Sequence, residues 1–442
     1  MSHTAIHRHA IDLLFAAITL EIGDRGRLCS FLFGPPGSNE HQRRMGIEIY
    51  FNDPEMTKAV LYVRKQGPLY LRTVAIESVR NALIEFVTGN FWYLADECYG
   101  PRFSGTFAEN VTQPVKDQMA DALALDSIFQ PTTQLHLYPL VPVTVDKDFD
   151  SDAFFLVGHN GLNEERLRSH VLAREIASSQ FPPLRSWQGR KKHPQSWLGI
   201  RAVTADGADA DRTIVLGALA LTPLPHYRHM FSGRPLFGGR CIFGGSASTK
   251  FGDAHTPPLM HDLVITQADF GWLSVLAEKI SRNEKAVRRE MRALRYFYRA
   301  WFLEPSERFP WLCMSLDAIF GEAGSAAKAV IDSVRDTVGD HVEDARLRRL
   351  MDLRAAVLHG GAPNVYESSK YDDYYGAYLV DPVRDLELIV GYCLRTRIFG
   401  TALQEHADPN RRIIEEAQAA GRLPANLHPP TILDGSSGET SV

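Results

Sequence analysis

Apolar residues recur at helical spacing through most of the C-terminal half of the chain. Between about residues 266 and 399, prolines are few and apolar side chains return every three or four positions, as in Phe270, Leu273 and Leu276. This spacing is typical of helices that bury one face. Gly360-Gly361 predicts a helix end, and Asp381-Pro382 predicts a helix start with an acidic N-cap. The pattern therefore predicts an all-helical bundle.

The N-terminal half has a different pattern, in which short runs of β-branched and aromatic residues alternate with turn-forming clusters. Such runs predict β-strands when glycine, proline or asparagine bound them. We expect strands at 28–33, 47–51, 59–63, 135–145, 153–157 and 213–221, a hairpin or isolated strand at 237–245, and a helix at 163–178. The sequence thus predicts the α+β class, with a strand-rich mixed α/β region followed by an all-α bundle.

The change of pattern near Pro257-Pro258 suggests where the chain divides. Its 442 residues exceed the usual size of one domain. We predict a mixed α/β domain over 1–262, a helical bundle over 263–404, and a short charged helix with a disordered tail over 405–442.

Composition excludes several classes of protein. Hydrophobic residues make up 45% of the chain and charged residues 23%, which excludes wholesale disorder. The five cysteines are widely spaced and form no CxxC pair, which argues against a disulfide framework or a zinc ribbon and favours the cytoplasm. Because no apolar stretch reaches about 18 residues, we expect no membrane span.

A row of basic residues suggests a local cationic surface, although the net charge of the chain is negative. Lys plus Arg number 48 and Asp plus Glu 53, so the chain carries a net charge of -5. Six cations nevertheless follow one another at helical spacing, with only Glu284 and Glu290 to offset them locally: Lys285, Arg288, Arg289, Arg292, Arg295 and Arg299. Such a stripe either attracts a phosphate backbone or is a solvated helix face whose arginines pair with acidic neighbours. The sequence leaves both interpretations open.

Arg354 and His359 form the most informative pair of residues in the sequence. Arg354 falls inside a predicted helix that begins near Val342, and His359 falls at its end, before two glycines that permit a left-handed stop. A histidine suits acid–base work near neutral pH, and an arginine suits a phosphate and the charge that builds on it. The pair could cleave RNA without a metal, and two copies across a two-fold axis would supply both a base and an acid.

Three other motifs carry less weight. The run 34–38 lacks the lysine of a phosphate-binding loop and predicts a hairpin turn. His226 and His229 lack a third ligand, so we interpret them as surface histidines and expect no metal site. Arg335 and His341 also fit an arginine–histidine spacing, which shows that spacing alone is a weak signal. Nothing in the sequence indicates a cofactor.

The helical half resembles a known family. The runs that carry the resemblance, in their order and spacing, are 293–300, 309–322, Val334-Arg335 and 353–360. Over about residues 266–400, under a third of the chain, they are similar to the Apea-like branch of the HEPN superfamily.

That resemblance implies a metal-independent endoribonuclease in which Arg354 and His359 are catalytic. It also implies a homodimer formed through the bundle, an RNA substrate such as tRNA, a role in anti-phage abortive infection, and an N-terminal sensor for a phage-derived trigger. Glu322 and Arg335 would support the site or the bundle, and Lys285, Arg288, Arg292, Arg295 and Arg299 would bind RNA. The residue after the motif arginine is commonly polar in active members, but here it is Ala355. The alternative is a non-catalytic HEPN module that binds RNA or a nucleotide, or a toxin–antitoxin scaffold.

Overall fold

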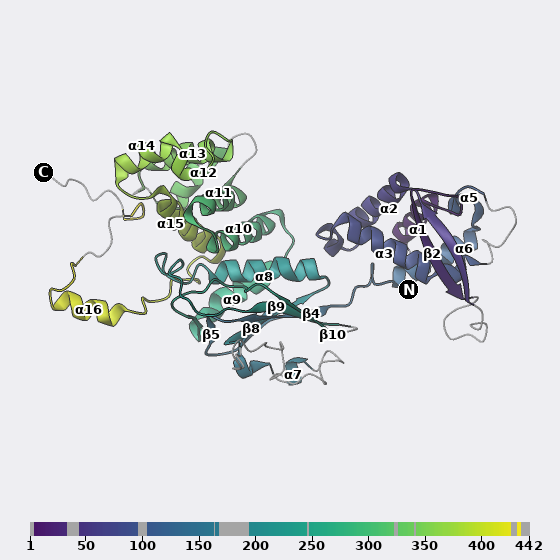
Figure 1. Ribbon diagram of the computed structural model, residues 1–442, viewed down its shortest axis with the longest axis horizontal. Coiled ribbons are helices and arrows are strands. Elements are labelled where there is room, and N and C mark those ends of the chain that lie inside the picture. The colour runs from purple at the N-terminus through teal and green to yellow at the C-terminus, as the bar shows by residue number, and fades with distance from the viewer. Residues whose placement is uncertain are drawn as a thin grey trace. The chain divides into compact units, whose positions relative to one another are not determined.

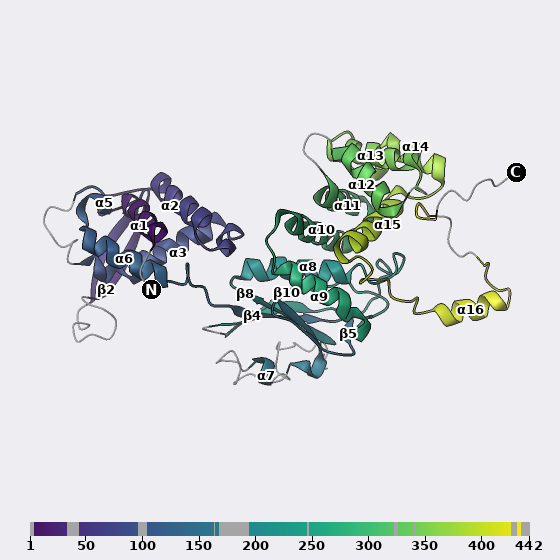
Figure 2. The same ribbon diagram turned by 180° about the vertical axis from the view of Figure 1, so that it is seen from behind.

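The chain folds into two compact units of an α+β protein. The structure is a computed structural model, and it describes residues 4–32, 44–95, 104–162, 164–167, 194–244, 247–321, 326–339, 342–425 and 431–434. Unit 1 comprises residues 1–133 with 203–207, and unit 2 comprises 134–202 with 208–442. Figure 1 and Figure 2 label the elements of each unit from two sides. The predicted turn at 34–38, most of the predicted helix at 163–178 and the end of the tail lie outside the described residues.

Unit 1 packs helices against a small antiparallel sheet. The strands lie in the order β1-β3-β2, and residues of α1, α2, α3 and α6 form a shared apolar core. The strands are β1 (Ile18–Thr19), β2 (Arg25–Leu32) and β3 (Arg44–Phe51). The helices are α1 (Ala5–Ala16), α2 (Asp53–Gln66), α3 (Ile76–Gly89), α5 (Phe107–Asn110) and α6 (Gln113–Leu125). Strands β2 and β3 confirm the predictions at 28–33 and 47–51.

The strand predicted at 59–63 is wrong, because these residues lie inside α2. The Asn52 side chain accepts a hydrogen bond from the Glu55 backbone N–H and caps the helix, and Pro54 stands in its first turn. The buried residues of α2 are Met56, Ala59, Val60 and Val63. That spacing is helical, and the short apolar run concealed it.

Unit 2 is built on a six-stranded antiparallel sheet. The strand order is β10-β9-β4-β8-β7-β6. The same unit also contains a separate two-stranded parallel sheet, formed by β11 and β5. The strands are β4 (Gln134–Leu140), β5 (Val143–Val145), β6 (Phe149–Asp150), β7 (Phe154–Gly158), β8 (Ser196–Ala202), β9 (Gly238–Phe243), β10 (Ala247–Gly252) and β11 (Leu263–Ile265). The predictions at 135–145, 153–157 and 237–245 are confirmed by β4 with β5, by β7, and by the β9–β10 hairpin.

The helices of unit 2 follow the predicted pattern over most of their length. They are α7 (Glu164–Leu167), α8 (Ala205–Leu219), α9 (Phe270–Ile280), α10 (Lys285–Trp301), α11 (Pro305–Phe320), α12 (Ala326–Val338), α13 (Asp344–Leu358), α14 (Ser369–Tyr378), α15 (Pro382–Leu394) and α16 (Arg411–Ala419), with a π-helical turn at Arg395–Phe399. The Asp381 side chain accepts a hydrogen bond from the Val383 N–H at 2.8 Å and caps α15 as predicted. Among the helices that the structure describes, none is both long and apolar enough to cross a membrane.

The strand predicted at 213–221 is also wrong, because these residues belong to α8 and the turn after it. Helix α8 lies between the sheet and α10 in both ribbon views (Figure 1, Figure 2). Ile214 to Leu219 are all buried, so the helix has no polar face in this stretch. A short apolar run without periodicity is ambiguous between a buried helix and a buried strand.

The boundary predicted at residue 262 lies inside unit 2. Strand β11 pairs Leu263 with Val143 of β5, and one apolar core joins sheet residues such as Leu156 to bundle residues such as Leu294. The diproline at 257–258 therefore precedes a strand of the same unit and does not mark a linker. The described unit boundary falls at residues 133 and 134.

Close packing of α8 on α10 makes Gly217 sensitive to substitution. A Cβ atom at Gly217 would lie 2.2 Å from the Leu294 carbonyl oxygen, and a backbone contact of this kind is relieved only if a helix moves. We expect Gly217→Ala to lower the free energy of unfolding by about 1–3 kcal/mol through overpacking. Gly376→Ala in α14, where nothing lies within 4 Å, is the control and should be neutral or slightly stabilising. Urea denaturation measures both, and equal effects would contradict the prediction.

Candidate functional site

Helix α13 ends at His359 in the way the two following glycines predict. His359 is the C-cap residue, and Gly360 takes a left-handed φ of +77°. The Gly361 N–H donates to the Ala356 carbonyl at 2.7 Å, and the Ala362 N–H donates to the same oxygen at 3.1 Å. The His359 side chain is exposed at this corner, and it makes no hydrogen bond to another residue in the described part of the chain. The imidazole is therefore open to a ligand from solvent.

Arg354 points back into the bundle and forms an ion pair with Asp317 of α11. Its side chain is 13% exposed. The Nε atom of Arg354 and the Oδ1 atom of Asp317 are both buried, and neither has a hydrogen-bond partner within the described residues. Asp317 thus fixes the guanidinium through one nitrogen and leaves other donors unused.

Cys313, one turn before Asp317, lies in the same cluster but is no candidate nucleophile. Its side chain is fully buried. Burial raises the pKa of the Cys313 thiol, and the charge of Arg354 counters this only in part. A thiol held in its neutral form is inert, so Cys313 adds no nucleophile to this region.

Within one chain, Arg354 and His359 do not face a common point. Five residues of α-helix separate two positions by about 7.5 Å along the axis and turn them by about 140°. Arg354 contacts α11, whereas His359 extends into solvent at the helix end. For both groups to act on one phosphate, a second protein surface would have to hold the RNA so that it reaches Arg354 and His359 together.

The basic stripe of α10 lies on one exposed face. The apolar residues between the cations, among them Met291, Leu294 and Phe297, are buried on the opposite face. Five of the six cations are exposed: Lys285, Arg288, Arg292, Arg295 and Arg299. We call these five residues the α10 stripe.

The two acids that are neighbours of the α10 stripe in sequence are engaged by other cations. Glu284 pairs with Arg282 at 3.2 Å, and Glu290 pairs with Lys279. None of the five stripe residues forms an ion pair with an acid of the described ranges. The described residues therefore supply no ion-pair partner for the α10 stripe, and of the two interpretations this favours phosphate binding.

One further acid lies near the stripe on α8. Burial raises the pKa of Asp211 to about 7, and the charge of Arg295 acts in the opposite direction. Near neutral pH this carboxyl is therefore only partly ionised, and it neutralises Arg295 incompletely.

The remaining sequence-predicted residues lie apart from the pair. Arg289 is half-buried and donates to the backbone carbonyls of Ala318 and Gly321, so it caps the end of α11 instead of extending the stripe. Arg335 pairs with Asp344 at the start of α13 and so joins two helices of the bundle. Glu322 and His341 lie outside the described residues.

His229 is not the surface histidine that the sequence suggested. Its Nε2 atom lies 2.9 Å from Oε1 of Glu387 in α15, and the Arg228 guanidinium donates to the same oxygen at 2.9 Å. Arg308 of α11 reaches Oε2 at 3.5 Å. Burial alone would raise the pKa of the Glu387 carboxyl, but His229 and the two arginines lower it to about 2. These four residues, the Glu387 cluster, join the 223–229 segment to the bundle.

Comparison of the chain with protein-family models, with curated protein sequences and with solved structures gave no match in any of the three. The resemblance to HEPN proteins therefore stays an expectation from the sequence.

Proposed function

We propose that unit 2 is a metal-independent endoribonuclease that uses Arg354 and His359. The observation that carries the proposal is the end of α13, where an exposed histidine follows an arginine whose guanidinium is oriented by Asp317. The α10 stripe supports it, because exposed cations without ion-pair partners among the described residues attract the backbone of RNA.

The chemistry needs one base, one acid and a stabiliser of negative charge. His359 takes the proton from a ribose 2′-hydroxyl, and the oxygen attacks the adjacent phosphorus. Arg354 stabilises the charge on the pentacoordinate phosphorane. The bond from phosphorus to the 5′-oxygen then breaks, and that oxygen receives a proton from an imidazolium, leaving a 2′,3′-cyclic phosphate and a 5′-hydroxyl. Because one chain offers one such histidine, the same residue of a second copy would be the acid, which makes a homodimer part of the proposal.

The biological setting is the one that the family resemblance implies. RNA such as tRNA would be the substrate, unit 1 would sense a phage-derived trigger, and cleavage would contribute to abortive infection. Toxicity on expression in a bacterial host, compared with the His359→Ala variant, tests this setting separately from the chemistry.

The α10 stripe gives a quantitative prediction for RNA binding. We expect a triple variant, with alanine at Arg288, Arg292 and Arg295, to bind RNA with a smaller dependence on salt. The slope of log affinity against log salt concentration should fall in magnitude by about 2, because each phosphate contact to single-stranded RNA contributes about 0.7 to that slope. Fluorescence anisotropy between about 50 and 200 mM salt measures the slope. The matched control changes three exposed arginines that already pair with acids, Arg348, Arg411 and Arg412. An unchanged slope in the stripe variant would remove the stripe from the RNA surface.

A non-catalytic RNA-binding module is the second candidate. The ion pair between Arg354 and Asp317 favours it, because an arginine with an internal carboxylate partner also has a structural role. The exposed Ala355 also favours this candidate, because the residue after the motif arginine is commonly polar in active members of the family that the sequence resembles. This candidate predicts salt-sensitive binding of RNA with no turnover.

RNA cleavage in a buffer that contains a metal chelator decides between the two candidates. The full chain should convert RNA to fragments with 2′,3′-cyclic phosphate and 5′-hydroxyl ends, identified by mass spectrometry. Binding without fragments would favour the module, and cleavage that requires added metal would overturn the proposed chemistry.

A further inference from the structure

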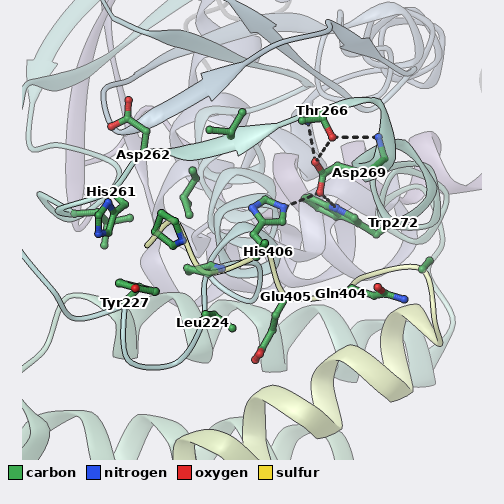
Figure 3. A pocket seen from close by; sticks show the side chains of 18 of the residues that line it. Leu224, Tyr227, His261, Asp262, Thr266, Asp269, Trp272, Gln404, Glu405 and His406 are labelled. Carbon is green, nitrogen blue, oxygen red and sulfur yellow. Dashed lines mark hydrogen bonds and ion pairs between the residues drawn. The ribbon is translucent and has the colours of Figure 1, made fainter. Parts of the chain in front are cut away.

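A cavity of about 650 Å³ lies in unit 2 between three separate segments of the chain. The segments are 223–227 after α8, 259–272 through β11 into α9, and 401–409 after the π-helical turn. Cavities of this size hold small organic ligands. Figure 3 shows the side chains that line it, with His406 near the centre. None of the residues proposed for RNA cleavage lines the cavity.

The wall of the cavity is held rigid by its own hydrogen bonds. The Tyr227 hydroxyl donates to Asp408 and accepts from the Asn410 side-chain amide at 3.1 Å, which fixes the 223–227 segment to the 401–409 segment. The His261 ring packs edge-on against Tyr227, with centroids 5.0 Å apart. The backbone N–H of His406 donates to the Thr222 carbonyl at 2.6 Å. A preformed wall lowers the entropic cost of binding.

Asp269 determines which nitrogen of His406 faces a ligand. Burial opposes ionisation of Asp269, but hydrogen bonds from His406, the Thr266 backbone and Trp272 lower the pKa of its carboxyl below the ordinary value. Trp272 Nε1, which can only donate, lies 2.9 Å from Oδ1, and His406 Nε2 lies 3.0 Å from the same oxygen. A carboxylate only accepts, so Nε2 carries the proton, and Nδ1 of a neutral His406 is left as an acceptor.

The acceptor nitrogen of His406 is directed into the cavity. In Figure 3 the ring nitrogen without a dashed line faces the side that holds Tyr227 and His261. It has no hydrogen-bond partner among the residues described. A ligand that completes this site must offer an O–H or N–H donor.

The charges of the wall exclude anions. The described residues of the lining include three carboxylates, of Asp262, Asp269 and Glu405, and no lysine or arginine. The guanidinium groups behind it are already paired, Arg234 with Asp262 and Arg395 with Glu405. A phosphate or carboxylate would therefore meet negative oxygens without a free cation, which costs free energy.

We propose that this cavity binds a small aromatic molecule that carries an alcohol or amine group and no acidic group. Its ring lies against the apolar and aromatic lining, which includes Leu224, Val264 and Tyr227. Its O–H or N–H donates to Nδ1 of His406. The site is distinct from the RNA-cleaving pair, and the proposal does not depend on nuclease activity.

Three probes that share one ring test the chemistry: benzyl alcohol, benzylamine and benzoate. Ligand-observed NMR on the full chain should detect the alcohol and the amine with dissociation constants of about 1 mM, typical of so few atoms. Benzoate should bind at least about fivefold more weakly. Equal or tighter binding of benzoate, or no binding of any probe, would overturn the proposal.

Two kinds of variant locate the probe. Val264→Trp fills the cavity from a half-exposed position of β11 and should abolish binding. Ala407→Trp fills the cavity from the 401–409 segment and should also abolish binding, so it serves as the second test if Val264→Trp does not fold. Ile413→Trp places the same ring on an exposed face of α16, outside the lining, and should bind like the wild type. His406→Phe keeps a ring but removes the acceptor, and should weaken binding of both the alcohol and the amine. Binding that survives both blocking variants rejects the site.

Discussion

Replacing His359 with alanine should lower the rate of RNA cleavage about 10²–10⁴-fold, the usual contribution of a general acid or base. Fold and RNA affinity should be nearly unchanged, because the ring is exposed and contacts no described side chain through a hydrogen bond. Exposed positions of this kind change the free energy of unfolding by less than about 0.5 kcal/mol. Initial rates with a labelled RNA in chelating buffer measure the loss.

The control for the histidine is His9→Ala, an exposed histidine of unit 1. It should cleave at the rate of the wild type. Cleavage by the His359→Ala protein at an unreduced rate would remove His359 from the mechanism, whatever the other residues do.

Arg354 needs a more conservative change, because alanine would also leave the half-buried Asp317 without its partner. Arg354→Lys keeps a positive charge beside Asp317 but loses the planar fork of donors that suits a phosphate. It should therefore reduce cleavage while the melting temperature changes little. Arg348→Lys, on the same helix and 70% exposed, is the matched control. If the two variants cleave equally well, Arg354 has a structural role, and the non-catalytic RNA-binding module becomes the favoured function.

The sequence predicted most of the helices because their two faces differ in polarity. In α10 the cations and the buried apolar residues alternate at helical spacing, so both the helix and its charged face follow from the pattern. Helix α8 gave no such signal, because it is covered on both sides and Ile214 to Leu219 are all buried. A strand and a doubly covered helix have the same apolar composition, and only tertiary packing separates them.

The candidate site was predictable only as far as it is local in sequence. Arg354, His359 and the helix stop at Gly360 lie within seven residues, so their spacing could be read directly. Asp317 is 37 positions away on another helix, and its only signal was an acid among apolar neighbours such as Leu316 and Phe320. The pairing itself depends on how α11 packs against α13, which spacing does not encode.

The cavity and the Glu387 cluster could not be predicted either, because their residues lie even farther apart in the sequence. Each joins segments separated by more than a hundred residues, as with His406 and Asp269 or Arg228 and Glu387. The interpretation of His229 as a surface histidine rests on the missing third ligand, which says nothing about a carboxylate on α15. The sequence identified groups that lie close together along the chain, and the fold was needed for the others.

The Glu387 cluster should be a sensitive polar feature of unit 2. The Glu387 side chain is 8% exposed and that of Arg228 is 1% exposed. Changing Glu387 to glutamine removes the only ion pair of Arg308 among the described residues, and it leaves Arg228 with only its longer 3.7 Å pair to Glu405, which Arg395 also binds. Removing one partner of a buried ion pair costs about 3–5 kcal/mol, so Glu387→Gln should lower the free energy of unfolding of unit 2 by that amount in urea denaturation.

The effect of Glu387→Gln should also depend on pH. The pKa of Glu387 in the folded chain is about 2, below its ordinary value of 4.5, so its ionised form stabilises the fold. That contribution is complete above about pH 4.5 and is lost as the pH falls toward 2. The wild type and the variant should therefore differ most near neutral pH and converge in acid. Glu307→Gln, an exposed acid on α11, should change stability little at any pH. A Glu387→Gln effect below about 1 kcal/mol, or one independent of pH, would mean that the buried charges are not coupled.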